Sequence, residues 1–276
     1  MALRINYNLA ASVAQRSLTT SQDAYSRQAE RLSTGLRINK AGDDAAGLAV
    51  SEKLKNQVRG LNQAQRNAQD GISLIQTAEG ALNETHAILS RMRELAVQSA
   101  NDTLTASDRA NLSTEFTQLY AEVERIANTT QFNTAPLLNS SGAATALTFQ
   151  IGANNGDTLV FTTSSARATS LEATMSALTI TAQSVAASGI SSLDAAINVV
   201  SKNRADFGAL QNRLESTIRS LGVASENTSA ANSRIVDADI AASMSELVRT
   251  QILQQAGISV LAQANQAPSL ILSLLK

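Results

Sequence analysis

The stretch that decides the fold is LKNQVRGLNQAQRNAQDGISLIQTAEGALNETHAILSRMRELA, residues 54–96, in which an apolar side chain recurs every seven residues. The members of this repeat are Leu54, Leu61, Ala68, Ile75, Leu82, Leu89 and Ala96. Side chains at this spacing form one seam along an α-helix, and such a seam packs against a partner helix over its whole length. The repeat predicts a single helix from about Asp44 to Ala100, with Asp43 and Asp44 placed to favour its N-terminus.

Two further helices carry seams of the same kind. One seam consists of Leu112, Phe116, Leu119, Val123 and Ile126, and the other of Leu193, Val200, Phe207, Leu214 and Leu221. Thr105 or Ser107 can cap the first of these helices, while Ser191 with Asp194 resembles a capping box at the start of the second. The seams predict a mainly α fold, a long antiparallel α-helical coiled-coil bundle. Its helix-packing residues are expected to be Leu54, Leu61, Ile75, Leu82, Leu89, Phe116, Val200, Phe207 and Leu214.

A small β-hairpin is expected between the last two of these helices. Apolar side chains alternate with polar ones from Leu147 to Ile151, and the turn sequence GANNGD then precedes LVFTT. Alternation interrupted by Gly, Asn and Asp indicates a hairpin, which we place near residues 137–163. The Ser- and Thr-rich stretch near residues 164–192 shows little periodicity and is expected to be exposed.

The two ends of the chain carry weaker helical patterns, at residues 3–34 and 235–275, and are expected to pair with each other. No charged side chain occurs between Thr250 and Leu275. Two paired helices bury only part of each helix, so the remaining apolar faces must meet other molecules. The residues expected to form this terminal coiled coil and its assembly contacts are Leu18, Tyr25, Leu32, Leu253, Val260, Ala264, Ile271 and Leu274.

The composition argues against several kinds of binding site. The chain has 22 basic and 23 acidic residues and a net charge of −1, so it lacks the excess of basic residues that nucleic acids or anionic membranes attract. It has no cysteine, which excludes disulfides and thiolate zinc sites. His86 is the only histidine, and a lone histidine within a helical seam is expected to pack between helices rather than to bind a metal.

No catalytic constellation is recognisable, and the phosphate-binding and dinucleotide-binding glycine motifs are absent. We therefore expect no enzymatic activity, no cofactor and no metal. The start, MALRINYNLAASVAQ, lacks the basic and apolar regions of a secretory signal peptide. Polar residues and Pro268 interrupt the uncharged tail, so membrane insertion is not expected.

Several long motifs resemble the terminal signatures of bacterial flagellins. Near the N-terminus these are LSTGLRINKAGDDAAGLAVSEKL (32–54), QDGISLIQTAEGALNE (69–84) and RMRELAVQSAND (91–102). Near the C-terminus they are NTSAANSRIVDADIA (227–241) and ILQQAGISVLAQANQAP (252–268). The resemblance covers roughly residues 1–140 and 185–276, and the order of the motifs makes it specific.

The resemblance implies a structural subunit that polymerises into the flagellar filament for swimming motility. It implies an inner terminal coiled-coil domain, residues 1–44 plus 233–276, and a rod-like helical domain, residues 45–232, without large outer domains. Flagellins leave the cell by the flagellar type III channel with an uncleaved signal and end in the extracellular filament. The implied partners are other subunits, an export chaperone, and the filament cap and hook-junction proteins.

Two alternatives stay open at this point. A hook–filament junction protein shares the terminal architecture, and self-polymerisation without partners would distinguish it from a flagellin. A soluble coiled-coil adaptor would explain the seven-residue repeats but not the uncharged tail.

The RMRELAVQSAND motif also implies a host partner, because flagellins with this pattern are recognised by the flagellin-sensing Toll-like receptor. Arg91, Leu95 and Glu115 match the family's contact positions. The competing interpretation is structural, since the same stretch makes filament contacts and Leu95 fits a packing position of the helix.

Overall fold

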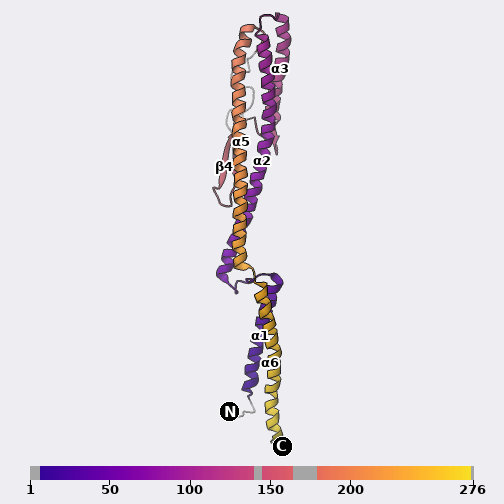
Figure 1. The fold of residues 1–276 in the computed structure, drawn as a ribbon, viewed down its shortest axis with the longest axis vertical. Coiled ribbons are helices and arrows are strands. Elements are labelled where there is room, and N and C mark those ends of the chain that lie inside the picture. The colour runs from indigo at the N-terminus through magenta and orange to yellow at the C-terminus, as the bar shows by residue number, and fades with distance from the viewer. Residues whose placement is uncertain (1–6, 140–144, 164–178, 275–276) are drawn as a thin grey trace. The chain divides into compact units, whose positions relative to one another are not determined.

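The computed structural model describes the chain except for residues 1–6, 140–144, 164–178 and 275–276 (Figure 1). The chain divides into two compact units. The terminal unit comprises Met1–Val58 and Glu226–Lys276, and the central unit comprises Arg59–Ser225. The boundary falls inside two long helices, each of which contributes residues to both units.

In the terminal unit, the helices from the two ends of the chain lie side by side (Figure 1). They are α1, Leu9–Thr34, and α6, Ile240–Leu274. The Asn8 side chain caps α1 by accepting a hydrogen bond from the Ala11 amide at 3.1 Å. Gly35 ends α1 in the left-handed conformation, with a φ of 70°, which a residue with a Cβ rarely adopts.

The segment between α1 and the next helix is held to the chain that precedes α6 by backbone hydrogen bonds. Leu36 and Asp237 form an antiparallel bridge, and the Arg37 amide donates to the Val236 carbonyl at 2.6 Å. Ile38 and Val236 are both buried at this bridge. This short bridge therefore joins the segment that follows α1 to the segment that precedes α6.

The central unit is built on three helices, α2 (Ala45–Ser99), α3 (Ala106–Thr129) and α5 (Gln183–Val236). The observed α2 agrees to within one residue at each end with the helix expected from the seven-residue repeat. Asp44 caps it, because its carboxylate accepts a hydrogen bond from the Gly47 amide at 2.8 Å.

The turn from α2 to α3 is stabilised by caps on both helices. Thr105 and Asp108 form a reciprocal capping box at the start of α3. Arg109 donates to the carbonyls of Ser99 and Asn101, each at 2.9 Å, and so satisfies acceptors that the end of α2 leaves free.

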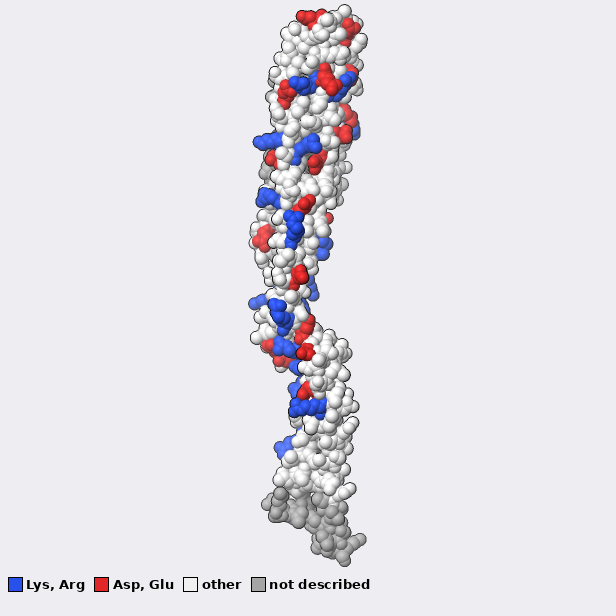
Figure 2. Space-filling view, viewed as in Figure 1, with Lys and Arg blue, Asp and Glu red and all other residues white. Residues whose placement is uncertain are grey.

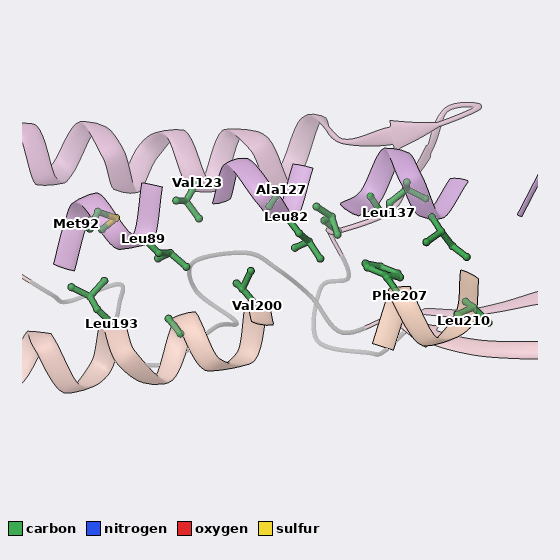
Figure 3. Close-up of a cluster of buried hydrophobic side chains, with 14 of the residues drawn as sticks. Leu82, Leu89, Met92, Val123, Ala127, Leu137, Leu193, Val200, Phe207 and Leu210 are labelled. Atoms are coloured by element: carbon green, nitrogen blue, oxygen red, sulfur yellow. The ribbon is translucent and has the colours of Figure 1, made fainter. Parts of the chain in front are cut away.

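The core of the central unit lies where α2, α3 and α5 face one another. Figure 3 shows side chains of the three helices pointing toward this shared interior. Leu82 and Leu89 of α2, Val123 of α3, and Leu193 and Val200 of α5 are fully buried there. The seams inferred from the sequence therefore meet in one continuous cluster.

Two small antiparallel hairpins complete the central unit. The first pairs β1, Gln131–Phe132, with β2, Ala135–Pro136, and the second pairs β3, Thr145–Gln150, with β4, Thr158–Thr163.

The β3–β4 hairpin packs on both long helices of the central unit. A Cβ at Gly71 of α2 would lie 3.2 Å from the Phe149 ring. The rings of Phe161 and Phe207 have their centroids 5.2 Å apart. The apolar side chains of the hairpin thus extend the helical core.

The fold class is confirmed as mainly α, with long packed helices, a small β-hairpin and paired termini. The expected start of α5, near Ser191, was wrong. The helix begins at Gln183, so Ser191 and Asp194 lie inside it and do not form a capping box. The Asp194 carboxylate instead accepts a hydrogen bond from Arg93 Nε of α2 at 2.6 Å.

Part of the stretch expected to be exposed belongs to the core. Ile180 and Ala186 are fully buried, and the Ser99 hydroxyl donates to the Ile180 carbonyl. Leu137 and Leu138, placed by the sequence at the start of the hairpin region, are buried as well. Residues 164–178 of the expected exposed segment lie outside the described part of the chain.

Candidate functional site

The α6 helix leaves large apolar side chains on the surface of the subunit. Apolar residues are distributed almost evenly around this helix, so α1 can cover only part of them. Leu253 is 46% exposed and Val260 is 57% exposed, and Ile252 and Ile258 are exposed as well. On the face shown in Figure 2, few charged side chains lie on the described end of the α1–α6 pair nearest the termini.

The surfaces of α1 and α6 also form an apolar groove, which we call the terminal groove. It has a volume of about 670 Å³ and is partly open to solvent. Leu9, Val13 and Leu18 of α1 line one side, and Leu253 and Val260 of α6 line the other. An apolar groove beside exposed apolar side chains is typical of a surface that another protein covers.

The residues expected to form the terminal coiled coil are placed as follows. Leu18, Tyr25, Leu32 and Ala264 are half-buried, whereas Leu253 and Val260 are exposed. Ile271 and Leu274 belong to α6, but their side chains lie outside the described part of the structure. Pairing of α1 with α6 in one subunit therefore buries only part of the apolar side chains that the sequence predicts in the terminal coiled coil.

The contacts that join α1 to α6 include hydrogen bonds that the apolar pattern does not reveal. Asn8 Nδ2 donates to the Ala264 carbonyl at 2.8 Å. Gln254 Nε2 donates to Gln22 Oε1 at 2.9 Å and to the Ser21 carbonyl at 3.5 Å. These amides occur as ordinary polar residues in the sequence, which carries no signal for their pairing.

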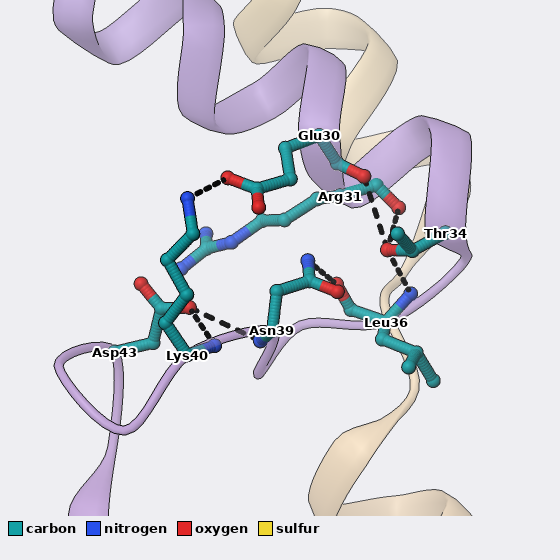
Figure 4. A network of polar contacts seen from close by, with 7 residues as sticks. All are labelled: Glu30, Arg31, Thr34, Leu36, Asn39, Lys40 and Asp43. Atoms are coloured by element: carbon teal, nitrogen blue, oxygen red, sulfur yellow. Dashed lines mark hydrogen bonds and ion pairs between the residues drawn. The ribbon is translucent and has the colours of Figure 1, made fainter.

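The segment after α1 is stabilised by a polar network (Figure 4). Lys40 Nζ lies 2.8 Å from Glu30 Oε2, and the hydrogen bond to Glu30 raises the pKa of Lys40. The Asp43 carboxylate accepts hydrogen bonds from the amides of Lys40 and Asn39, which lower the pKa of Asp43. The network fixes the turn that leads into α2.

The residues that match receptor-contact positions fall into two environments. Arg91 of α2 and Glu115 of α3 form an exposed ion pair at 3.0 Å, and Arg91 also bonds Glu94 at 3.0 Å. The hydrogen bond to Glu94, followed by the one to Glu115, raises the pKa of Arg91 above its usual value. Leu95 is fully buried, so its side chain is part of the core and not of the surface.

The packing residues expected in the long helices are mostly inside the central unit. The buried ones are Leu61, Ile75, Leu82, Leu89, Phe116, Val200, Phe207 and Leu214. Leu54 is half-buried and belongs to the terminal unit.

Within the described residues, no group of three or more His, Cys, Asp or Glu side chains is arranged to hold a metal ion. No helix in the part of the chain that the structure describes is both long and apolar enough to span a membrane.

Comparison with known proteins identifies the relatives of this chain. The model of the bacterial flagellin N-terminal helical region matches residues 5–143, and that of the bacterial flagellin C-terminal helical region matches residues 190–275. A flagellin of Halalkalibacterium halodurans is 51% identical over 272 residues, covering 99% of both chains. A flagellin of Bacillus subtilis is 44% identical over 305 residues, covering 99% of this chain and 100% of that protein.

A solved structure is similar as well. The crystal structure of Bacillus cereus flagellin has a TM-score of 0.51 and 33% sequence identity, and the match covers 56% of this chain and 88% of that one.

Proposed function

The chain belongs to the bacterial flagellins and is a structural subunit of the flagellar filament, and we propose that different parts of it form separate layers of that filament. Copies of the chain assemble into the extracellular filament. Residues 1–44 and 233–276, which lie within the terminal unit, form the inner layer, and residues 45–232 form the layer outside it. The observation that carries this proposal is the exposed, uncharged surface of α6 beside the terminal groove.

An inner layer is the environment that such a surface requires. Complete burial of a fully exposed Leu or Val side chain contributes about 1.5–3 kcal/mol. Because Leu253 and Val260 are about half exposed in the subunit, covering the exposed part of each would contribute roughly half as much to assembly. A repeated head-to-tail contact that does not close on itself extends into a helical polymer. The central unit, by contrast, has a continuous core within one subunit.

Seeded polymerisation tests the assignment. Purified subunits are added to sheared filament fragments, and growth is followed by light scattering and electron microscopy. A chain truncated after Thr250 should not elongate the seeds, because it lacks most of α6. Circular dichroism of the truncated chain controls for folding of the central unit. Normal elongation by a folded, truncated chain would contradict the proposed role of α6.

The same experiment separates a filament subunit from a hook–filament junction protein. A subunit of the filament should elongate seeds without any other protein, whereas a junction protein should stop after adding at most a few copies. Full-length similarity to flagellins favours the first outcome.

We propose further that a cytoplasmic chaperone covers the exposed face of α6 until the chain leaves through the flagellar type III channel with its signal uncleaved. The cap and hook-junction proteins would then contact the ends of the growing filament. Exposed apolar side chains on a subunit before assembly support a requirement for such cover. Loss of chaperone binding in the chain truncated after Thr250, measured by calorimetry, is the expected result; undiminished binding would contradict it.

The host Toll-like receptor is proposed to meet the surface around Arg91 and Glu115. Their ion pair is exposed, and its position on two adjacent helices gives a defined pattern of charge. Leu95, which is buried, would act by holding this part of α2 in place rather than by touching the receptor.

A cell reporter assay tests this surface with variants of known folding. The Arg91→Ala, Glu115→Ala pair should reduce receptor activation, and addition of Leu95→Ala should reduce it further. The matched control is Arg125→Ala with Glu122→Ala, which removes another exposed ion pair, at 2.6 Å, within α3. Full activity of the folded triple variant, or equal loss in the control, would refute the proposed site.

A further inference from the structure

Apolar contact alone does not determine the register of the α1–α6 pair. Apolar side chains are spread almost evenly around α6, and no charged residue occurs from Gln251 to Leu274. A helix of this kind can slide along its partner by one repeat and keep most of its apolar contact. Helix pairs with such seams use isolated polar side chains to select one register.

Two amide side chains cross from one helix to the other at well-separated levels. Asn8 Nδ2 donates to the Ala264 carbonyl at 2.8 Å, while Asn8 Oδ1 accepts from the Ala11 amide at 3.1 Å. The Asn8 side chain thus caps α1 and also binds the N-terminal end of this helix to α6 at Ala264. At the other level, Gln254 Nε2 donates to Gln22 Oε1 at 2.9 Å.

Between these two levels, Gly257 allows a close approach. A Cβ at this position would lie 3.3 Å from Leu18 Cδ1, so the leucine packs over the backbone of α6. A shift of seven residues in either direction would place Thr250 or Ala264 opposite Leu18. Each of these has a Cβ, which would occupy the space that the glycine leaves open.

We propose that Asn8, Gln254 and Gly257 together select the register of the terminal helix pair. They thereby determine which part of α6 is presented to neighbouring subunits in the filament. Neutral amides suit this position, because a charged side chain would be far more costly to desolvate when the neighbours cover the pair. Their bonds also persist at any salt concentration or pH, since neither partner titrates.

Distances between two labels in assembled filaments can measure the register. The chain has no cysteine, so Ser26→Cys on α1 and Gln251→Cys on α6 provide the only two attachment sites for spin labels. Both positions are exposed in the subunit. A small fraction of labelled chain is assembled with excess unlabelled wild-type chain, so that pulsed electron paramagnetic resonance reports distances within single subunits.

The test variant combines Asn8→Ser with Gln254→Leu. Serine keeps a side-chain oxygen that can cap α1, adds no charge and loses the amide donor to Ala264, and leucine keeps the bulk of Gln254 without its hydrogen bond. The control variant makes the same chemical changes at Asn265→Ser and Gln255→Leu. These are exposed α6 amides for which the described structure records no side-chain bond to α1.

Wild-type and control filaments should each give one narrow distance distribution. The test variant should add a second population, in which α1 and α6 are displaced along their axes by about 10 Å, the length of seven helical residues. Gly257→Val should populate the same displaced state.

Three outcomes would overturn the proposal. One is a test variant with the single wild-type distance, and another is a control that broadens as much as the test variant. The third is a Gly257→Val filament that keeps the single wild-type distance.

Discussion

In the central unit, α2, α3 and α5 bury their apolar seams against one another, whereas in the terminal unit the described seam residues of α1 and α6 are half-buried or exposed. Leu82, Leu89 and Leu214 have no exposed surface, but the only residue of α1 that is buried is Ala14. The same chain therefore contains a core that is complete in one subunit and a second apolar surface that one subunit leaves partly uncovered. The difference shows that a heptad pattern predicts burial without saying which molecule provides the partner.

Leu89→Ala and Leu253→Ala remove the same atoms from the two units and should give the largest contrast. Leu89 is 0% exposed and Leu253 is 46% exposed. In the isolated subunit, Leu89→Ala should lower the free energy of unfolding by about 3 kcal/mol, because it leaves a cavity. Leu253→Ala should change it by less than about 0.5 kcal/mol. Urea denaturation followed by circular dichroism measures both values.

Assembly should reverse the order of these two variants. Leu253→Ala should slow seeded elongation at concentrations where Leu89→Ala, if still folded, elongates normally. Equal loss of stability in the isolated subunit would break the comparison, because the terminal unit would then possess a complete core of its own.

Two glycines of α2 test how tightly the central unit is packed. A Cβ at Gly60 would lie 2.9 Å from the Cβ of Ala153, whereas a Cβ at Gly80 would meet nothing within 4 Å. Gly60→Ala should destabilise the subunit by about 1–3 kcal/mol through overpacking against the hairpin turn. Gly80→Ala should stabilise it by about 1 kcal/mol, because alanine is the better helix former. Thermal unfolding shows whether each substitution raises or lowers the midpoint temperature. Stabilisation by both would show that the turn at Ala153 moves aside at little cost in free energy.

Salt should distinguish the ion pair between α2 and α5 from the neutral amide hydrogen bonds between α1 and α6. Arg93 and Asp194 join α2 to α5 at 2.6 Å, with side chains 44% and 48% exposed. A double-mutant cycle with Arg93→Ala and Asp194→Ala should show a small coupling in the urea midpoint at low salt and almost none at high salt. Coupling that persists at high salt would indicate a pair shielded from solvent.

A single capping carboxylate should give the smallest effect, visible only as a dependence on pH. The Thr105 hydroxyl and then the Thr105 amide donate hydrogen bonds that lower the pKa of Asp108. The stabilisation is fully present above the unfolded pKa of about 3.9 and is lost as the pH falls through the lower folded pKa. Asp108→Asn should therefore be less stable than wild type at neutral pH, and the two should converge near the acid limit. A constant difference in thermal midpoint across this range would contradict the assignment.

Much of the fold could be predicted because long helices repeat one physical signal many times. The bounds of α2 and the cap at Thr105 follow from the seven-residue spacing and from capping chemistry. The start of α5 could not be predicted, because Ser and Ala dominate residues 183–192 and leave no amphipathic pattern. The burial of Ala186 in the core cluster, next to the contact of Ile180 with Ser99, shows that this stretch packs against the core.

The first hairpin and the site were harder to predict for a different reason. The turn between β1 and β2 uses Asn133 and Thr134 at φ values of 48° and 66°, and threonine gives little warning of a left-handed conformation. The terminal seam residues were recognisable by spacing, but the amides that cross between α1 and α6 were not. Their pairing depends on register, which short-range patterns do not encode.

The even distribution of apolar side chains around α6 has a mechanical consequence. Contact with such a helix depends on buried area and hardly on direction, so a neighbouring subunit that covers α6 could rotate about it at little cost. Within one subunit, the side-chain hydrogen bonds of Asn8 and Gln254 oppose movement of α1 along α6. We therefore expect each α1–α6 pair to move as one unit, while the contact between neighbouring pairs yields to torsion as the filament turns and bends.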